Sequence, residues 1–154
     1  MFNIVLHQPE IPPNTGNIIR LCANTGSKLH LIHPLGFVIS EKNLERAALD
    51  YGEGVEIIHH KNFEAFLQNT QLRSYYSVST KGEHMMNDIN IKAGDYLMFG
   101  SETKGLPKGC LTHEKCQKVI RIPMADGSRS LNLSNSVAII VYFALGQDDF
   151  TGLS

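Results

Sequence analysis

Short apolar runs alternate with amphipathic stretches along this chain, and their lengths predict strands alternating with helices. About six runs rich in β-branched and aromatic residues predict buried strands, at residues 2–6, 29–33, 55–59, 75–79, 96–99 and 119–122. Helices are predicted between them, at residues 14–25, 40–49, 63–67 and 134–145. This alternation predicts an α/β fold with a mostly parallel sheet and helices on both faces.

The first predicted helix carries one apolar stripe. Ile18, Leu21, Cys22 and Thr25 recur at helical spacing, and Gly26 follows as a residue that can end the helix in a left-handed conformation. Arg20 lies off this stripe, so its side chain is expected to be outside the core.

The last predicted helix follows a polar loop and differs from the first in having no polar face. Asn132, Ser134 and Asn135 are candidate N-caps, which place the start of the helix near Ser134. Residues 137–145 are apolar on every side, which predicts a helix covered by its own sheet on one side and by a second subunit on the other. The run is too short to span a bilayer.

Composition sets broad limits on domain number, compartment and partners. A length of 154 residues, of which 42% are hydrophobic, predicts one domain over residues 1–154. The net charge of −1 means that RNA binding would need a local basic patch or one shared between subunits. Three cysteines without C-x-x-C spacing argue against a disulfide framework and a zinc site, and the N-terminus lacks signal-peptide features, so a cytoplasmic, membrane-free protein is expected.

Polar loops follow three of the predicted strands, at residues 78–81, 99–107 and 122–135. Ligands of parallel α/β sheets bind outside the carboxyl ends of the strands, so these loops are expected to form a site. Gly100, Gly105 and Gly127 permit positive φ and close backbone approach, which a nucleoside-sized ligand requires. The chain contains neither G-x-G-x-x-G nor a Walker A motif.

Segments of the chain resemble the three motifs of the SPOUT superfamily of RNA methyltransferases. They are NTGNIIR at 14–20, FGSETKGL at 99–106, and IPM at 122–124 with SLNLSNSVA at 130–138. Within the superfamily the chain is most similar to the small tRNA (cytidine/uridine) 2′-O-methyltransferases that act on the wobble nucleotide of the anticodon. The resemblance covers essentially the whole chain, so it implies a single domain over residues 1–154 without a separate RNA-binding domain. It implies a C-terminal deep trefoil knot, S-adenosylmethionine as methyl donor, no metal, a homodimer with the active site near its interface, and a tRNA anticodon stem-loop as partner.

The resemblance also assigns roles to individual residues. Arg20 is implied to act on the ribose hydroxyl, with Asn14 and Glu102 ordering its surroundings and Ser130 and Asn132 completing the pocket. A guanidinium stays protonated, so Arg20 is expected to bind a phosphate and stabilise the developing alkoxide rather than accept a proton. An alternative for Glu102 is a turn carboxylate that caps the helix expected near Leu106. The implied cofactor-binding residues are Val78, Gly100, Ile122, Met124, Ser130 and Leu131.

The predicted RNA contacts and the function both leave alternatives open. Lys104 and Arg129 belong to a basic run that forms either a phosphate-facing patch or an ordinary solvated face. Tyr142 either stacks on a nucleotide or belongs to a subunit interface. Two other functions compete with wobble methylation: methylation of another RNA such as ribosomal RNA, and a non-catalytic RNA-binding module. The second is disfavoured because all four implied site residues are present: Arg20, Glu102, Ser130 and Asn132.

Overall fold

A single parallel sheet organises the computed structural model, which describes residues 1–38 and 54–154. Within these residues the sheet has seven strands in the order β3-β2-β1-β6-β4-β7-β5, and every adjacent pair is parallel. The strands are β1 (Asn3–His7), β2 (Lys28–Ile32), β3 (Ile57–His60), β4 (Tyr75–Val78), β5 (His84–Met85), β6 (Tyr96–Phe99) and β7 (Cys116–Arg121). The predicted α/β fold with a parallel sheet is confirmed.

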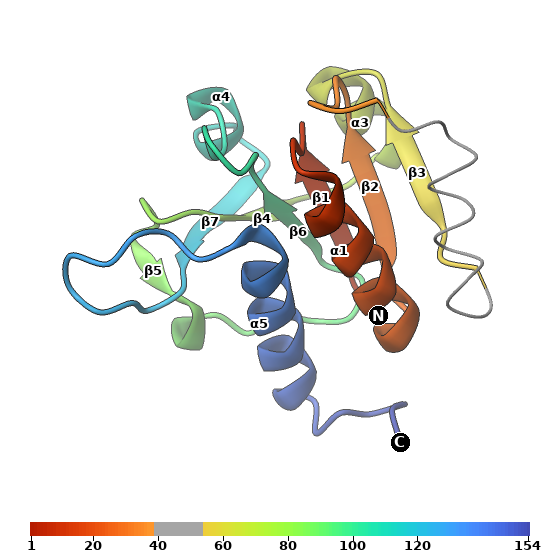
Figure 1. The fold of residues 1–154 in the computed structure, drawn as a ribbon. Helices are drawn as coiled ribbons and strands as arrows, with labels where there is room; N and C mark the ends of the chain where they lie inside the picture. Colours follow the sequence, from red (N-terminus) through yellow and green to blue (C-terminus); the bar gives the residue numbers. More distant parts are fainter. Residues whose placement is uncertain (39–53) are drawn as a thin grey trace.

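Helices cover both faces of the sheet, as predicted (Figure 1). Helices α1 (Pro12–Thr25) and α5 (Leu133–Gly146) pack against each other and lie side by side on one face. Helices α3 (Phe63–Thr70) and α4 (Lys108–Leu111) contribute to a second core on the other face. Ile4 and Leu6 of β1 belong to the first core and Val5 to the second, as the twofold alternation of a strand requires. The helix predicted at residues 40–49 lies outside the described residues.

Helix α1 begins two residues before the predicted start, because Pro12 and Pro13 form its first turn. The N–H groups of a first turn have no partner within the helix, so proline is tolerated there. The helix ends as predicted at Gly26, which has a φ of 62° and donates its N–H to the carbonyl oxygen of Cys22. Its buried side includes Ile18 and Cys22, while Arg20 is exposed.

Four strands begin at other residues than predicted, β1 and β2 by one residue each, and two short elements were not predicted. Strand β3 begins at Ile57 instead of residue 55, and β7 begins at Cys116 instead of residue 119. The first half of β7 has no apolar run that would predict a strand. It pairs only with β4 and is partly exposed, so polar residues are tolerated there. Strand β5 and the 3-10 turn Met86–Asp88 are too short for a hydrophobic period to identify them. Helix α4 corresponds to the helix expected near Leu106 and begins at Lys108.

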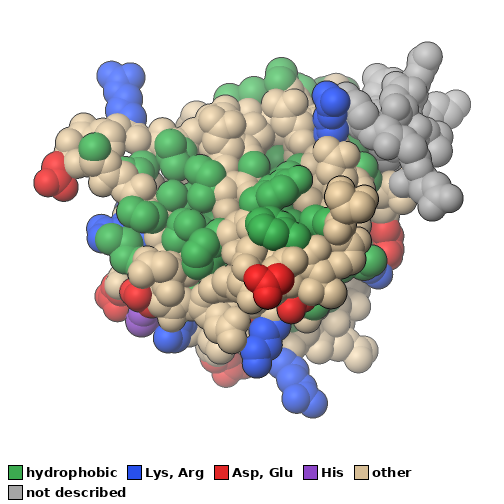
Figure 2. Space-filling view, turned by 90° about the horizontal axis from the view of Figure 1, so that it is seen from below, with side chains coloured by type: hydrophobic (Ala, Val, Ile, Leu, Met, Phe, Trp, Pro, Cys, Tyr) green, Lys and Arg blue, Asp and Glu red, His purple; other side chains and the backbone are tan. Residues whose placement is uncertain are grey.

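Helix α5 has one buried face and one exposed apolar face. Asn132 is its N-cap, which agrees with the predicted start. Val137, Ile140 and Val141 are fully buried, whereas Ile139 is 36% and Tyr142 45% exposed. Apolar side chains gather on the end of the molecule near the end of α5 and the C-terminus (Figure 2). No helix in residues 1–38 and 54–154 has the length and apolar character needed to cross a membrane.

Candidate functional site

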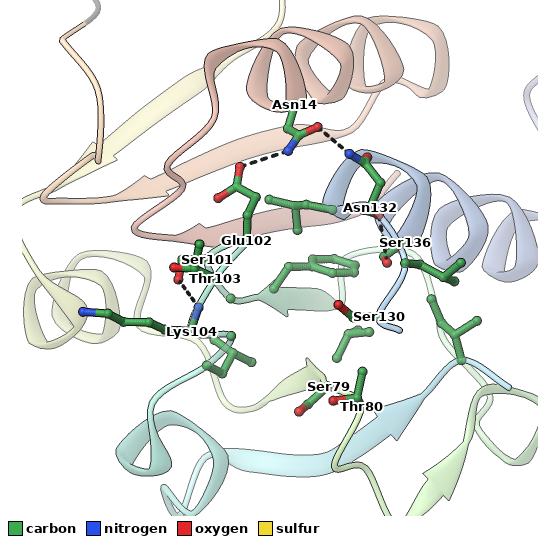
Figure 3. A pocket seen from close by; sticks show the side chains of 18 of the residues that line it. Asn14, Ser79, Thr80, Ser101, Glu102, Thr103, Lys104, Ser130, Asn132 and Ser136 are labelled. Carbon is green, nitrogen blue, oxygen red and sulfur yellow. Dashed lines mark hydrogen bonds between the residues drawn. The ribbon is translucent and has the colours of Figure 1, made fainter. Parts of the chain in front are cut away.

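A cavity of about 430 Å³ opens where β4, β6 and β7 end, at the edge predicted to hold the ligand (Figure 3). All six residues predicted to bind the cofactor line it: Val78, Gly100, Ile122, Met124, Ser130 and Leu131. Asn14, Glu102, Asn132 and Lys104 line it as well. The walls therefore combine apolar side chains, hydroxyls and exposed backbone groups, as is usual for small-molecule sites.

The wall that follows β6 is a tight loop that depends on two glycines. A Cβ on Gly100 would lie 2.0 Å from the carbonyl carbon of Gly105, so no side chain fits at this position. Gly105 has a φ of 66° and donates its N–H to the carbonyl oxygen of Ser101 at 2.9 Å. Both glycines predicted to shape this loop do so, and they bring its backbone to the cavity.

The turn after β4 lines the cavity with Ser79, Thr80 and Lys81, which the predicted cofactor residues did not include. Ser79 donates its N–H to the carbonyl oxygen of Ile120 on β7 at 2.9 Å. A Cβ on Gly82 would lie 2.6 Å from the carbonyl carbon of Ile120, so this turn packs directly on β7. Their position directly after a predicted strand is the feature of the sequence that could have assigned them to the cavity.

Three residues far apart in the sequence form one hydrogen-bonded chain beside the cavity (Figure 3). The amide nitrogen of Asn14 donates to Glu102 at 3.1 Å, and the amide nitrogen of Asn132 donates to Asn14 at 2.9 Å. The side-chain oxygen of Asn132 accepts the backbone N–H of Ser134 at 2.9 Å, which caps α5. These hydrogen bonds connect the β6 loop, α1 and α5. The three elements carry the three segments that resemble the SPOUT motifs.

The carboxylate of Glu102 is occupied by backbone donors as well. It accepts the N–H groups of Glu10 at 2.7 Å and Ile11 at 3.0 Å, so it caps the start of α1. Ile11 is the N-cap of this helix and has no side-chain capping bond of its own. The N-cap of α4 is Pro107 and receives no side-chain capping bond, so the alternative that Glu102 caps the helix near Leu106 is wrong. A carboxylate engaged by three N–H groups is suited to ordering its neighbours rather than to receiving a proton.

Three predicted site residues are outside the lining of this cavity. Arg20 is exposed on α1, about 9 Å along the helix axis from Asn14. Arg129 is exposed in the loop before α5, and Tyr142 lies on the exposed face of that helix. Lys104 does line the cavity, but its side chain extends away from the centre (Figure 3).

The residues around the cavity fit a nucleoside-sized ligand. Ser79, Thr80 and Ser130 offer hydroxyls, and Val78 and Ile122 offer apolar surface for a flat ring system. Because Gly100 has no side chain, the backbone of Gly105 and Leu106 packs directly against it, and the loop after β6 lines the cavity. Within the part of the chain that the structure describes, no three His, Cys, Asp or Glu side chains are grouped to hold a metal ion.

The model of the SpoU rRNA Methylase family matches residues 1–142. The chain belongs to this family. Two curated relatives in the SpoU family are tRNA (cytidine(34)-2′-O)-methyltransferases. The one from Saccharophagus degradans is 52% identical over 152 residues, with 99% of both chains covered. The one from Escherichia coli K12 is 49% identical over 152 residues, covering 99% of this chain and 97% of the relative.

Solved structures agree with this SpoU family membership. A putative RNA methyltransferase from Bacillus anthracis has a TM-score of 0.89 and 42% identity, and covers 100% of this chain and 98% of its own. A structure described as giving insight into 2′-OH methylation of C/U34 on tRNA has a TM-score of 0.87 and 40% identity, with 97% of both chains covered. The methyltransferase AviRb from Streptomyces viridochromogenes, in complex with AdoMet, shares the fold at 22% identity and a TM-score of 0.83, covering 96% of this chain and 60% of its own.

Proposed function

We propose that this SpoU family protein is an S-adenosylmethionine-dependent tRNA methyltransferase that modifies the ribose 2′-hydroxyl of the pyrimidine wobble nucleotide, position 34. The observation that carries the proposal is the identity of 52% with a tRNA (cytidine(34)-2′-O)-methyltransferase over 99% of both chains. The candidate cavity supports it, because Gly100, Ser130 and Asn132 of the matched segments lie around one nucleoside-sized space.

In this proposal S-adenosylmethionine binds in the cavity of about 430 Å³. When bound, S-adenosylmethionine supplies a methyl group that is already activated by its positively charged sulfur. The chain has to hold the donor and the ribose in line and to help the hydroxyl lose its proton. Backbone groups at Gly100, Ile122 and Leu131 hold the nucleoside part, while the Ser130 hydroxyl offers a hydrogen bond.

Arg20 is the residue assigned to the substrate hydroxyl. Its guanidinium binds a phosphate next to the target ribose and stabilises the alkoxide that develops, while the proton leaves through phosphate or water. Asn14, Glu102 and Asn132 keep α1 and α5 in place around the site through their hydrogen-bonded chain. In this scheme Glu102 orders the site and accepts no proton.

The active form is a homodimer in this proposal. Ile139 and Tyr142 expose apolar surface on α5, and α5 packs beside α1, which carries Arg20. A second copy on this surface would bring Arg20 near a subunit interface, and Arg20 is not among the residues that line the cavity of its own chain. Lys104 and Arg129 are the residues proposed to contact the tRNA anticodon stem-loop, whereas Tyr142 is assigned to the subunit interface.

The same proposal includes a single domain over residues 1–154 with a deep trefoil knot. Residues 122, 124 and 130–132 line one cavity with the loop after β6, although β7 and β6 lie on opposite sides of β4. This supports a C-terminal segment that threads the loop. A cytoplasmic location fits a tRNA substrate and three free cysteines.

The deciding experiment is mass spectrometry of nucleosides from tRNA incubated with the protein and isotope-labelled S-adenosylmethionine. Wild type should label 2′-O-methylcytidine or 2′-O-methyluridine at position 34, and Arg20→Ala should lower the rate by about a hundredfold or more. Arg20→Lys should also be slow, because an ammonium cannot bind phosphate through two parallel hydrogen bonds. Arg73→Ala, at another exposed arginine, is the matched control. Label on a base, or only on ribosomal RNA offered in parallel, would refute the wobble-ribose proposal.

A further inference from the structure

The loop that precedes α1 and the loop that follows β6 are joined by two carboxylates, each of which accepts hydrogen bonds from the other loop. Glu102 of the second loop accepts the N–H groups of Glu10 at 2.7 Å and of Ile11 at 3.0 Å. In return, the two carboxylate oxygens of Glu10 accept the hydroxyl of Thr103 at 2.8 and 2.9 Å. Each loop thus provides one carboxylate and the donors for the other, and we call Glu10, Glu102 and Thr103 the reciprocal clamp.

Each of the two loops is also anchored on its other side. Gly36 donates its N–H to the carbonyl oxygen of Pro9 at 2.9 Å. A Cβ on Gly36 would lie 2.9 Å from the Cα of Glu10, so the two backbones are in direct contact. The β6 loop is closed by the bridge between Ser101 and Gly105. The reciprocal clamp therefore joins two defined pieces of backbone rather than two free loop tips.

The charge of Glu10 strengthens its half of the clamp. Hydrogen bonds from the side chains of Ser101 and Thr103 lower the pKa of Glu10 below its ordinary value. The carboxylate is therefore ionised at neutral pH, and a hydroxyl donates a stronger hydrogen bond to a charged acceptor than to a neutral one.

The clamp lies at the border between the cavity and the helix that carries Arg20. Thr103 and its neighbours in residues 100–106 line the cavity, and Ile11 and Asn14 of α1 line it from the other side. We propose that Glu10 and Thr103 are positioning residues for methyl transfer, which hold the wall of the cofactor cavity against the start of α1. This inference rests on the proposed function. In this role both residues act through the β6 loop and α1 rather than on the reacting atoms.

The test compares Thr103→Val, which keeps the shape of the side chain and removes its donor, with Thr103→Ser, which keeps the donor. Thr103→Val should weaken S-adenosylmethionine binding roughly three- to tenfold in calorimetry without tRNA, and should lower kcat at saturating cofactor. Thr103→Ser should restore most of both quantities. Thr112→Val is the matched control, since its exposed hydroxyl donates to the carbonyl oxygen of Lys108 on α4, outside the cavity.

A second variant, Glu10→Gln, tests the same contact from the other loop. If the pair acts as a unit, Glu10→Gln combined with Thr103→Val should bind the cofactor no more weakly than the weaker single variant. Wild-type affinity and kcat in Thr103→Val, or additive losses in the double variant, would overturn the positioning role. If Thr103 only stabilised the fold, Thr103→Val would lower the midpoint of urea unfolding and leave the cofactor affinity and kcat of the folded protein unchanged. The cofactor affinities decide this question even if wild type binds cofactor and fails to methylate tRNA, a result that would refute only the proposed function.

Discussion

At the scale of single residues, Gly100 determines the path of the β6 loop backbone that forms one wall of the cavity. Its missing Cβ would lie 2.0 Å from the carbonyl carbon of Gly105 and 2.2 Å from the backbone nitrogen of Leu106. A contact this short involves backbone on both sides, so neither partner can relieve it by changing rotamer. Any side chain at this position must therefore displace the β6 loop.

Gly100→Ala is expected to abolish measurable cofactor binding and to destabilise the fold by about 1–3 kcal/mol, because the loop that forms the cavity wall has to shift. Calorimetric titration with S-adenosylmethionine and urea unfolding would measure the two effects. Gly109→Ala is the matched control, since a Cβ there meets no atom within 4 Å. A Gly100→Ala protein with wild-type cofactor affinity would contradict the geometry of this wall.

At the scale of elements, Asn132 connects α5 to α1 with the two ends of one amide. Its oxygen caps α5 at the N–H of Ser134, and its nitrogen donates to Asn14. The capping function requires only an acceptor, while the link to Asn14 requires a donor. Aspartate and alanine substitutions can therefore separate the two functions.

Asn132→Asp should keep the stability of the protein within about 0.5 kcal/mol and lower kcat, because the cap remains and the donor to Asn14 is lost. Asn132→Ala should lower both, with about 1 kcal/mol lost in urea unfolding. Methyl-transfer rates at saturating cofactor give the second readout. Equal rates in wild type and Asn132→Asp would show that the link between α1 and α5 has no part in the reaction.

A buried histidine pair joins β2 and β3 away from the cavity. Nδ1 of His30 lies 3.0 Å from Nε2 of His60, and Nε2 of His30 lies 3.3 Å from the side-chain oxygen of Asn3. With both rings neutral, His60 donates to His30 and His30 donates to Asn3. This leaves Nδ1 of His60 without a proton, in agreement with its lack of a partner among the described residues. Burial, and then the neighbouring His60, lower the pKa of His30 to about 4.

This pair predicts a stability that falls on mild acidification. The unfolded chain protonates His30 near pH 6.5, whereas the folded protein does so only near pH 4, so the unfolded state binds more protons between these values. The free energy of unfolding should be constant above about pH 6.5 and should fall by up to about 3 kcal/mol towards pH 4. The lowered pKa values of His7 and His60 act in the same direction. Urea titrations between these limits test the prediction, and stability that rises on acidification would contradict it.

At the scale of the whole molecule, the exposed face of α5 is the feature that a second copy would cover. Its neighbour on the same face of the sheet is α1, so both helices would take part in an interface there (Figure 1). Apolar side chains on a helix surface are stabilised when a second subunit removes them from water. The proposed dimer follows from this surface together with the exposed position of Arg20.

Ile139→Asp is expected to yield monomers in sedimentation velocity, because it places a charge in the proposed interface without touching the core of the chain. If the active site depends on the second subunit, the rate of methyl transfer should fall as the dimer is lost. Gln68→Asp, on the exposed side of α3, adds a charge on the other face of the sheet and serves as the control. A stable dimer of Ile139→Asp would place the interface elsewhere.

The sequence by itself determined the class of fold, the C-terminal end of α1, the start of α5, and the loops that form the cavity. These features depend on local patterns: apolar period, the acceptor of Asn132, and the freedom of Gly26 and Gly105 to adopt positive φ. Only the tertiary structure decided that Glu102 caps α1, that Thr103 binds Glu10, and that Arg20 lies outside the cavity lining of its own chain. Such contacts join residues about ninety positions apart, and which strands become neighbours in the sheet is set by packing of the whole chain, which no local pattern encodes.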